Sequence, residues 1–325
     1  MESKIKVVIM SFIVSVVASL IIIPILRKLK VGQIERDDGP QSHLKKQGTP
    51  TMGGVIIIIS MIIASIVLYR VKDIINFQNF KEMLALIFVT LGFGIVGFVD
   101  DFKKLVLKNT KGLKPMYKMI GLLIIAVLYT MYIVKFVPNG TETYIPIIKQ
   151  FINIPIWLYI PFAIFVLLGT TNAINLTDGI DGLATSVTTI IITALTVIGV
   201  IFGKFEITFL GCILIGACLG FLIFNLHPAK VFMGDTGSLL LGGAIAGMAL
   251  YLKMPLILIV LAIIPIIETV SVMLQVVYFK KTGKRIFKMA PIHHHFELCG
   301  WNENKVVSIF SIITLILSII AIAIV

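Results

Sequence analysis

Charged residues are scarce in this chain of 325 residues: they make up 14% of it, while hydrophobic residues make up 58% and the mean hydropathy is +1.06. A soluble domain typically carries about 25% charged residues, so this composition excludes one. Cysteine is scarce too, and Cys212, Cys218 and Cys299 offer neither a disulfide framework nor the spacing of metal ligands. No polar stretch is long enough for a second domain, so we expect a single domain over residues 1–325.

The sequence instead contains ten apolar stretches, each about as long as a bilayer-spanning helix. Such a helix needs about 20 apolar residues to cross the roughly 30 Å hydrocarbon core. The predicted spans are Ile5–Leu26, Met52–Tyr69, Met83–Val99, Met116–Val134, Ile156–Thr171, Leu183–Phe202, Phe205–Phe224, Ser238–Leu252, Pro255–Phe279 and Val306–Val325. The first span resembles a signal peptide but lacks a small-residue cleavage site, so we keep it as a membrane helix. The predicted fold class is an all-α polytopic membrane protein.

The distribution of basic residues predicts the orientation of these spans. The loops after spans one, three, five, seven and nine hold 19 Lys and Arg residues, the opposite loops hold 7, and the N-terminal tail holds 2. Basic residues near span ends are retained in the cytoplasm, so the first set of loops is predicted to be cytoplasmic and both termini outside. This rule and the attraction to anionic lipid account for most of the net charge of +12. No basic domain stands clear of the membrane, so nucleic acid is not an expected partner.

The outer loop between spans four and five departs from the helical pattern. It contains Asn139-Gly140, a two-residue turn signal, and continues through Tyr144–Ile147 and Phe151–Ile154. Turn residues beside short runs of β-branched and aromatic residues are typical of a hairpin. We therefore predict a small external hairpin at this position.

Almost every residue able to do chemistry falls in the loops predicted to be cytoplasmic. The five motifs are Gly48–Gly54, Asp100–Lys104, Asn172–Gly182, Asn225–Gly237 and Pro291–Glu297. Because these loops can meet only in three dimensions, they predict one active site at the membrane surface. Three basic loops beside carboxylates favour a polyanionic substrate.

The acidic residues of these motifs lack enough local counterions. Asp100 and Asp101 are adjacent at the end of a span, where carboxylates are costly unless a cation or solvent neutralises them; a solvated helix end paired with Lys104 is the plain alternative. The segment Asn172–Gly182 contains no Lys or Arg at all. It also lacks the ligand spacing and closing glutamate of an EF-hand.

The Asn225–Gly237 motif admits two interpretations. Asp235 precedes a helix and could cap it, or it could face Asp100 and Asp101 and complete an oxygen site for Mg²⁺. Phe232 could be ordinary packing or a stacking surface for a nucleobase.

Three consecutive histidines, His293, His294 and His295, lie inside the chain and are followed by Glu297. Consecutive histidines do not easily converge on one tetrahedral ion, which disfavours zinc. Contact with phosphate or proton transfer is the functional interpretation, and a solvated loop is the alternative.

Taken together, these motifs resemble the phospho-N-acetylmuramoyl-pentapeptide-transferase family, within the polyprenyl-phosphate N-acetylhexosamine-1-phosphate transferase superfamily. The resemblance covers essentially the whole chain. The aspartate motifs are shared by the superfamily, whereas Thr51–Gly54 and the triple histidine with Phe296 and Glu297 point to the muramoyl-pentapeptide branch. The resemblance implies transfer of phospho-N-acetylmuramoyl-pentapeptide from its uridine diphosphate carrier (UDP-MurNAc-pentapeptide) to undecaprenyl phosphate. The products would be lipid I and UMP, made with Mg²⁺ at the cytoplasmic face of a bacterial inner membrane.

The resemblance also implies roles for individual residues. The catalytic set is Asp100, Asp101, Asp235 and His293, with Asp235 and Asp101 as metal ligands. The substrate-binding set is Lys46, Thr49, Lys104, Lys118, Asn172, Asn175, Asp178, Asp181, Asn225, Phe232, His294 and His295. Within that set, Asp181, Asn225 and Phe232 are expected to form the uridine pocket. A direct attack and a covalent aspartyl route would use the same residues, and a homodimer is left open.

Two alternatives stay open from the sequence. A sibling transferase acting on UDP-N-acetylglucosamine would share the chemistry without peptide recognition. An ion-coupled transporter would also fit ten spans and the intramembrane Glu268, but transporters usually place polar sites at the bilayer midplane between repeated halves, and no repeat is evident.

Span nine carries a proline and a carboxylate in an apolar run. Pro265 predicts a bend, and Glu268 is expensive in lipid unless it faces protein or water. We expect a bent helix with a lipid-facing groove that leads undecaprenyl phosphate toward Asp100, Lys104 and His293. The alternative is a packing kink in which Glu268 bonds to a neighbouring helix.

Overall fold

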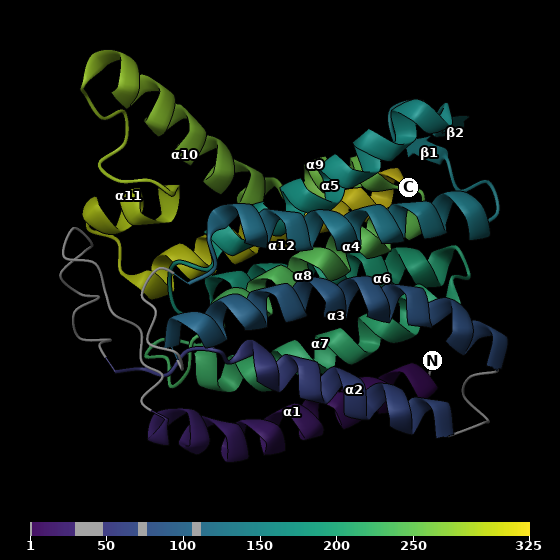
Figure 1. The fold of residues 1–325 in the computed structure, drawn as a ribbon, viewed down its shortest axis with the longest axis horizontal. Helices are drawn as coiled ribbons and strands as arrows, with labels where there is room; N and C mark the ends of the chain where they lie inside the picture. Colours follow the sequence, from purple (N-terminus) through teal and green to yellow (C-terminus); the bar gives the residue numbers. More distant parts are fainter. Residues whose placement is uncertain (1, 30–47, 71–76, 106–111) are drawn as a thin grey trace.

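The computed structural model describes residues 2–29, 48–70, 77–105 and 112–325, and nearly all of them are helical (Figure 1). In chain order the elements are α1 (Glu2–Lys28), α2 (Gly54–Arg70), α3 (Phe77–Leu105), α4 (Pro115–Phe136), β1 (Glu142–Ile145), β2 (Gln150–Asn153), α5 (Ile156–Thr177), α6 (Leu183–Ile201), α7 (Phe205–Asn225), α8 (Gly234–Tyr251), η2 (Pro255–Ile257), α9 (Leu258–Leu261), α10 (Ile263–Thr282), α11 (Ile292–Leu298) and α12 (Glu303–Ile324). The predicted fold class is confirmed.

Each of the ten predicted spans coincides with helical structure. Spans one to eight correspond to α1 to α8, span nine to η2, α9 and α10, and span ten to α12. Among the described residues, eight helices are long and apolar enough to cross a membrane, namely α1, α3, α4, α5, α6, α7, α10 and α12. The apolar helix α2 is shorter, with 17 residues. The chain is thus an integral membrane protein, and the number of ten crossings stays a prediction.

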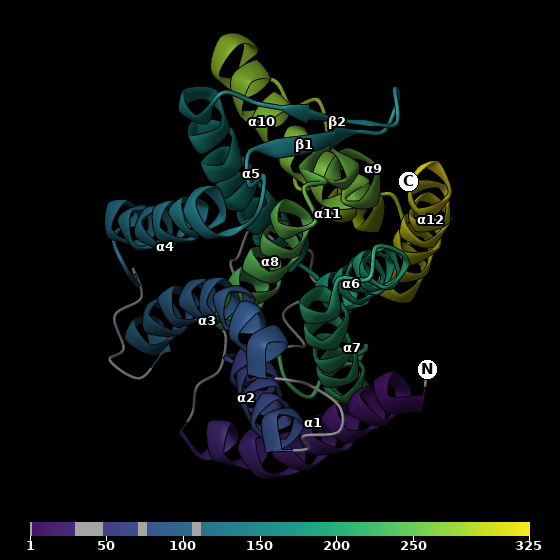
Figure 2. The same cartoon turned by 90° about the vertical axis from the view of Figure 1, so that its right-hand side faces the viewer.

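Helix α8 is the centre of the bundle. Figure 2, which views the molecule from one end, shows α8 surrounded by α3, α5 and α6, and every residue from Thr236 to Tyr251 is buried. Helix α3 packs tightly against it, because a Cβ at Gly97 would collide with the backbone of Asp235. Small residues permit such close approach between membrane helices. Since its neighbours shield α8 from lipid, this helix can begin with a polar turn.

The termini and the hairpin lie at one end of the bundle, and α11 lies at the other (Figure 1). The predicted hairpin is confirmed: β1 and β2 are antiparallel, with Tyr144 opposite Phe151. The predicted turn residues, however, do not join the strands. Residues 146–149 do so, whereas Asn139 follows α4, takes a positive φ of 50° and accepts a 3.0 Å hydrogen bond from the N–H of Glu142. Asn139-Gly140 therefore marks the exit from α4.

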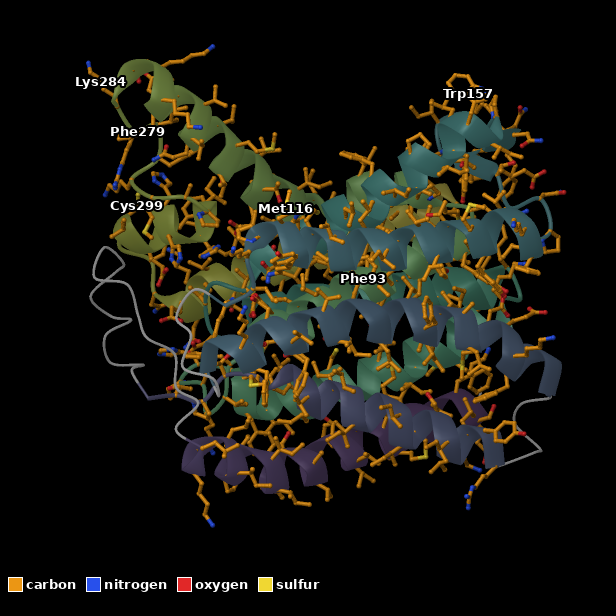
Figure 3. All side chains as sticks on the ribbon, in the orientation of Figure 1. Phe93, Met116, Trp157, Phe279, Lys284 and Cys299 are labelled. Carbon is orange, nitrogen blue, oxygen red and sulfur yellow. The ribbon has the colours of Figure 1, made fainter. Side chains whose placement is uncertain are left out.

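The ninth span is interrupted, as predicted, but at a different residue. Helices α9 and α10 are separated at Ala262, which has φ −102° and ψ 28°. Pro265 lies in the first turn of α10, where its missing N–H leaves no intrahelical bond unmade. Beyond the break, α10 projects away from the other helices, with Phe279 and Lys284 near its tip (Figures 1 and 3). The lipid groove beside this helix stays a prediction.

Candidate active site

Asp235, at the start of α8, contacts side chains from three other helices. Its Oδ2 lies 2.9 Å from the Nζ of Lys104 on α3 and 2.9 Å from the Nζ of Lys118 on α4. Its Oδ1 accepts a 2.8 Å hydrogen bond from the Nδ2 of Asn175 on α5. Three residues predicted to bind substrate therefore converge on one predicted catalytic carboxylate.

Asp100 shares the same lysines. Its Oδ2 lies 2.6 Å from the Nζ of Lys104 and 3.7 Å from that of Lys118, and its Oδ1 accepts a 2.7 Å hydrogen bond from the N–H of Leu113. The ion pair with Lys104 that the sequence suggested is present, but it belongs to a larger network. We call Asp100, Lys104, Lys118, Asn175 and Asp235 the carboxylate–lysine cluster.

The cluster favours the ionised form of Asp235. Burial by itself disfavours the charged carboxylate. A hydrogen bond with Asp100 and the positive charges of Lys118 and Lys104 outweigh burial and hold the pKa of Asp235 well below its usual range. Asp235 therefore carries a negative charge at neutral pH.

Asp101 faces the N-terminus of α8. Its Oδ2 accepts hydrogen bonds from the N–H and Oγ1 of Thr236, at 2.8 and 2.7 Å, and its Oδ1 accepts one of 3.3 Å from the N–H of Asp235. A carboxylate at a helix N-terminus satisfies free N–H groups and the helix dipole. The capping role that the sequence offered to Asp235 thus belongs to Asp101, which leaves the Asp235 carboxylate available to the cluster.

Asp178 follows the last residue of α5, and its carboxyl group interacts electrostatically with Asp235 and Asp101. Protein atoms desolvate its carboxyl group even though the residue is partly exposed. This burial and the negative charges of Asp235 and Asp101 raise the pKa of Asp178 to about 8. Three carboxylates from α3, α5 and α8 therefore share one electrostatic environment.

A second acidic group lies around Asp181, between α5 and α6. Its Oδ2 accepts a 3.0 Å hydrogen bond from the N–H of Ala229 and lies 3.0 Å from the Nδ1 of His227. Glu303, on α12, lies 3.6 Å from that Nδ1 and accepts a 3.3 Å hydrogen bond from the N–H of Asp181. In the described part of the chain, Asp181, His227 and Glu303 are a set of possible metal ligands whose atoms lie within 4.8 Å of one another.

Sequence reasoning missed His227 and Glu303. His227 lies inside the Asn225–Gly237 motif, so its position was a usable signal. Glu303 is 122 residues from Asp181 and has no local signature besides its place at the start of α12.

Asn225 and Phe232 hold the segment between α7 and α8. The Oδ1 of Asn225 accepts a 2.6 Å hydrogen bond from Thr185, and its Nδ2 donates a 3.0 Å bond to the carbonyl of Val231. Phe232 is partly exposed, and its backbone forms 2.8 Å hydrogen bonds with Pro50 and Gly53. Asn225 thus supports the segment that carries Phe232.

The Thr51–Gly54 motif has a packing role. The N–H of Gly54 donates a 2.9 Å hydrogen bond to Met233, and a Cβ at Gly54 would collide with the backbone of Gly237. The two glycine backbones therefore bring the start of α2 directly against the start of α8, next to Asp235.

The three histidines point to different partners. His293 is fully buried, with its Nδ1 3.1 Å from the Oε2 of Glu268. The Nδ1 of His294 lies 2.8 Å from the Oε2 of Glu297, and the Nδ1 of His295 accepts a 3.1 Å hydrogen bond from the N–H of Lys288. The three rings do not form a common site in this structure.

The remaining predicted residues are less informative. Thr49 is partly exposed and Asn172 is exposed on α5. Lys46 lies outside the described residues. The structure thus gathers Asp100, Asp101, Lys104, Lys118, Asn175, Asp178 and Asp235 around the start of α8.

Comparison with known proteins relates the chain to a family of transferases. A family model described as glycosyl transferase family 4 matches residues 83–253, and a phospho-N-acetylmuramoyl-pentapeptide-transferase signature matches residues 46–58. The chain is similar to the phospho-N-acetylmuramoyl-pentapeptide-transferase of Clostridium perfringens strain 13, with 52% identity over 97% of this chain and 96% of the relative. It is similar to the Clostridium botulinum (strain Alaska E43) enzyme of that name, with 50% identity over 96% of this chain and 93% of the relative. For the Acetivibrio thermocellus enzyme the identity is 47% over 96% and 92%.

Proposed function

Since the chain belongs to the phospho-N-acetylmuramoyl-pentapeptide-transferase family, we propose that it transfers phospho-N-acetylmuramoyl-pentapeptide from UDP-MurNAc-pentapeptide to undecaprenyl phosphate. The products are lipid I and UMP, in a membrane step of peptidoglycan synthesis. The protein would lie in a bacterial inner membrane, with this site on the cytoplasmic face because the loops around it carry most of the basic residues.

The observation that carries this proposal is the convergence of Lys104 and Lys118 on Asp235 and Asp100. Phosphoryl transfer between two phosphate-bearing substrates depends mainly on positioning and on cations placed where negative charge is held. Lys104 is about one third exposed and Lys118 about one fifth exposed. Both ammonium groups can therefore exchange a carboxylate for the phosphate oxygens of an incoming substrate.

The residues around the start of α8 also fit a magnesium ion. Mg²⁺ prefers one or two carboxylates together with substrate phosphates. The negative charges of Asp235 and Asp101 raise the pKa of Asp178, which is the kind of repulsion that a bound cation relieves. Asp235 and Asp101 would be the ligands, and Asp235 would exchange a lysine contact for the ion. An ion held there would neutralise charge on the donor's diphosphate.

The nucleotide is assigned to the adjoining surface. The partly exposed Phe232 would contact the uracil by stacking. The carboxylate of Asp181 is buried and contacts Ala229 and His227, so Asp181 would form the wall behind this surface. The amide of Asn225 is buried and bonded at both ends, so we assign it to support of this surface. Asn175 would orient Asp235.

The test is transfer of radiolabel by the purified protein. UDP-MurNAc-pentapeptide labelled in the peptide is mixed with undecaprenyl phosphate and Mg²⁺, and the lipid extract is counted beside the UMP released. We expect label in the lipid and UMP in equal amounts. Transfer only from labelled UDP-N-acetylglucosamine would assign the sibling reaction instead, and absence of any labelled lipid would contradict an enzymatic role.

A further inference from the structure

We propose that Glu268, which the reaction above does not use, is a positioning residue that acts through His293 on the loop of residues 178–182. This loop contains Asp178 and Asp181, so we call it the nucleotide loop. The inference rests on the proposed function for its effect on substrates. Its structural part, a contact chain from α10 to the loop, can be tested separately.

The first contact joins α10 to the start of α11. The Oε2 of Glu268 lies 3.1 Å from the Nδ1 of His293 and 3.4 Å from its backbone N–H, which donates to it. Glu268 is fully buried, and its Oε1 has no hydrogen-bond partner among the described residues. A carboxylate in an apolar helix is costly and usually marks a functional position. Here it is directed at His293 and at no substrate-accessible surface.

The second contact joins His293 to the nucleotide loop. The imidazole is fully buried, and its Nε2 occupies the space that the Cβ of any other residue at position 179 would need. Neither ring nitrogen has a hydrogen-bond partner within the described ranges, so the 3.1 Å approach of Nδ1 to Glu268 is a close polar contact without hydrogen-bond geometry. The ring is therefore packed on the backbone of Gly179, between Asp178 and Asp181. Only glycine fits at this position without displacing the ring.

These two contacts give Glu268 and His293 a positioning role and not a catalytic one. Neither Glu268 nor His293 is exposed, so neither side chain can reach a substrate in this arrangement. Asp178 in the nucleotide loop, in contrast, is partly exposed and belongs to the groups that would face the donor. A displacement of about 1 Å in such groups is enough to slow a reaction about a hundredfold. By holding the ring, Glu268 would fix the backbone from which Asp178 and Asp181 project.

The kinetic test compares Glu268→Gln, which keeps the shape and removes the charge, with the parent protein. Positioning of the nucleotide loop predicts a rise of about tenfold in the KM for UDP-MurNAc-pentapeptide and little change in the KM for undecaprenyl phosphate. If Glu268 acts through His293, the double variant Glu268→Gln/His293→Gln will be no worse than His293→Gln alone. Thr269→Val, which removes the neighbouring hydroxyl on α10, is the matched control and should leave both values unchanged. Multiplying effects in the double variant, or equal rises for both substrates, would overturn the proposal.

A second measurement needs no activity. Hydrogen exchange of the amides in residues 178–182 should become several times faster in Glu268→Gln and remain at the parent rate in Thr269→Val. Gly179→Ala approaches the same contact from the loop side and should speed exchange as well, which covers the case in which Glu268→Gln fails to fold. Unchanged exchange in a folded variant of either kind would refute the contact chain. If exchange is faster in Glu268→Gln but the parent protein makes no lipid I, the contact chain is retained and the proposed function is rejected.

Discussion

Lys118 on α4 and Asp235 on α8 form a 2.9 Å ion pair although 117 residues separate them. The same oxygen of Asp235 also pairs with Lys104, so the two lysines neutralise a carboxylate that is mostly buried. A pair of this kind depends on both charges, because removing one leaves the other uncompensated.

Lys118→Gln should therefore lower the turnover rate by about 10² to 10³ fold, the usual cost of losing one group that stabilises developing charge. The measurement is steady-state formation of lipid I. Lys114→Gln is the control, since it removes an exposed charge just before α4. Equal activity in the two variants would show that the ion pair plays no part in the reaction.

The contact between α2 and α8 predicts a stability effect at Gly54. Alanine there would collide with the backbone of Gly237, and overpacking of this kind costs about 1–3 kcal/mol. Thermal unfolding in detergent should show a lower midpoint for Gly54→Ala. Gly169→Ala on α5, where a Cβ meets nothing within 4 Å, should leave the midpoint equal or slightly higher because alanine favours helix. Identical midpoints for the two variants would mean that α2 can move away from α8 freely.

Phe232 is assigned to base stacking, so Phe232→Ala should weaken binding of the uridine nucleotide by about tenfold, the equivalent of about 1.4 kcal/mol. Binding of undecaprenyl phosphate should change little. Calorimetry with each ligand measures both effects, and Phe232→Tyr, which keeps a ring, should retain most of the nucleotide affinity. A parallel loss for both ligands would indicate that the substitution disturbs the segment between α7 and α8 as a whole.

Asp178 predicts a pH dependence in the absence of Mg²⁺. Its pKa is raised to about 8 in the folded protein, while an aspartate in an unfolded chain ionises near pH 4. Between these values the folded state holds a proton that the unfolded state has lost, so stability falls as the pH rises through about 8. The thermal midpoint of the parent protein should therefore decrease from pH 6 to pH 9 more than that of Asp178→Asn. Parallel curves would contradict the raised pKa.

The helices were predictable from the sequence because their signal is local. The length of an apolar run can be counted directly in the sequence, and each of the ten runs coincides with helical structure. The site was predictable only as a set of residue types. The capping role that the sequence offered to Asp235 is filled by Asp101, since the choice depends on how α3 packs against α8 and not on the residues next to either aspartate.

Contacts between residues far apart in the chain could not be predicted from local sequence patterns. The Glu303 carboxylate accepts a hydrogen bond from the backbone N–H of Asp181, 122 residues away. The break in span nine falls at Ala262 and not at the proline. A proline in the first turn of a helix is harmless, so its effect depends on where the helix starts. That start is set by packing against other helices.

We propose that Asp235 organises the site, and the Asp235→Asn variant decides whether it does. Formation of lipid I and Mg²⁺-dependent binding of UDP-MurNAc-pentapeptide are measured side by side in the parent and the variant. We expect both to be lost together, because the amide keeps the shape of the side chain but cannot hold the cation or form ion pairs with Lys104 and Lys118. Lipid I formation at the parent rate with unchanged Mg²⁺ dependence would contradict it.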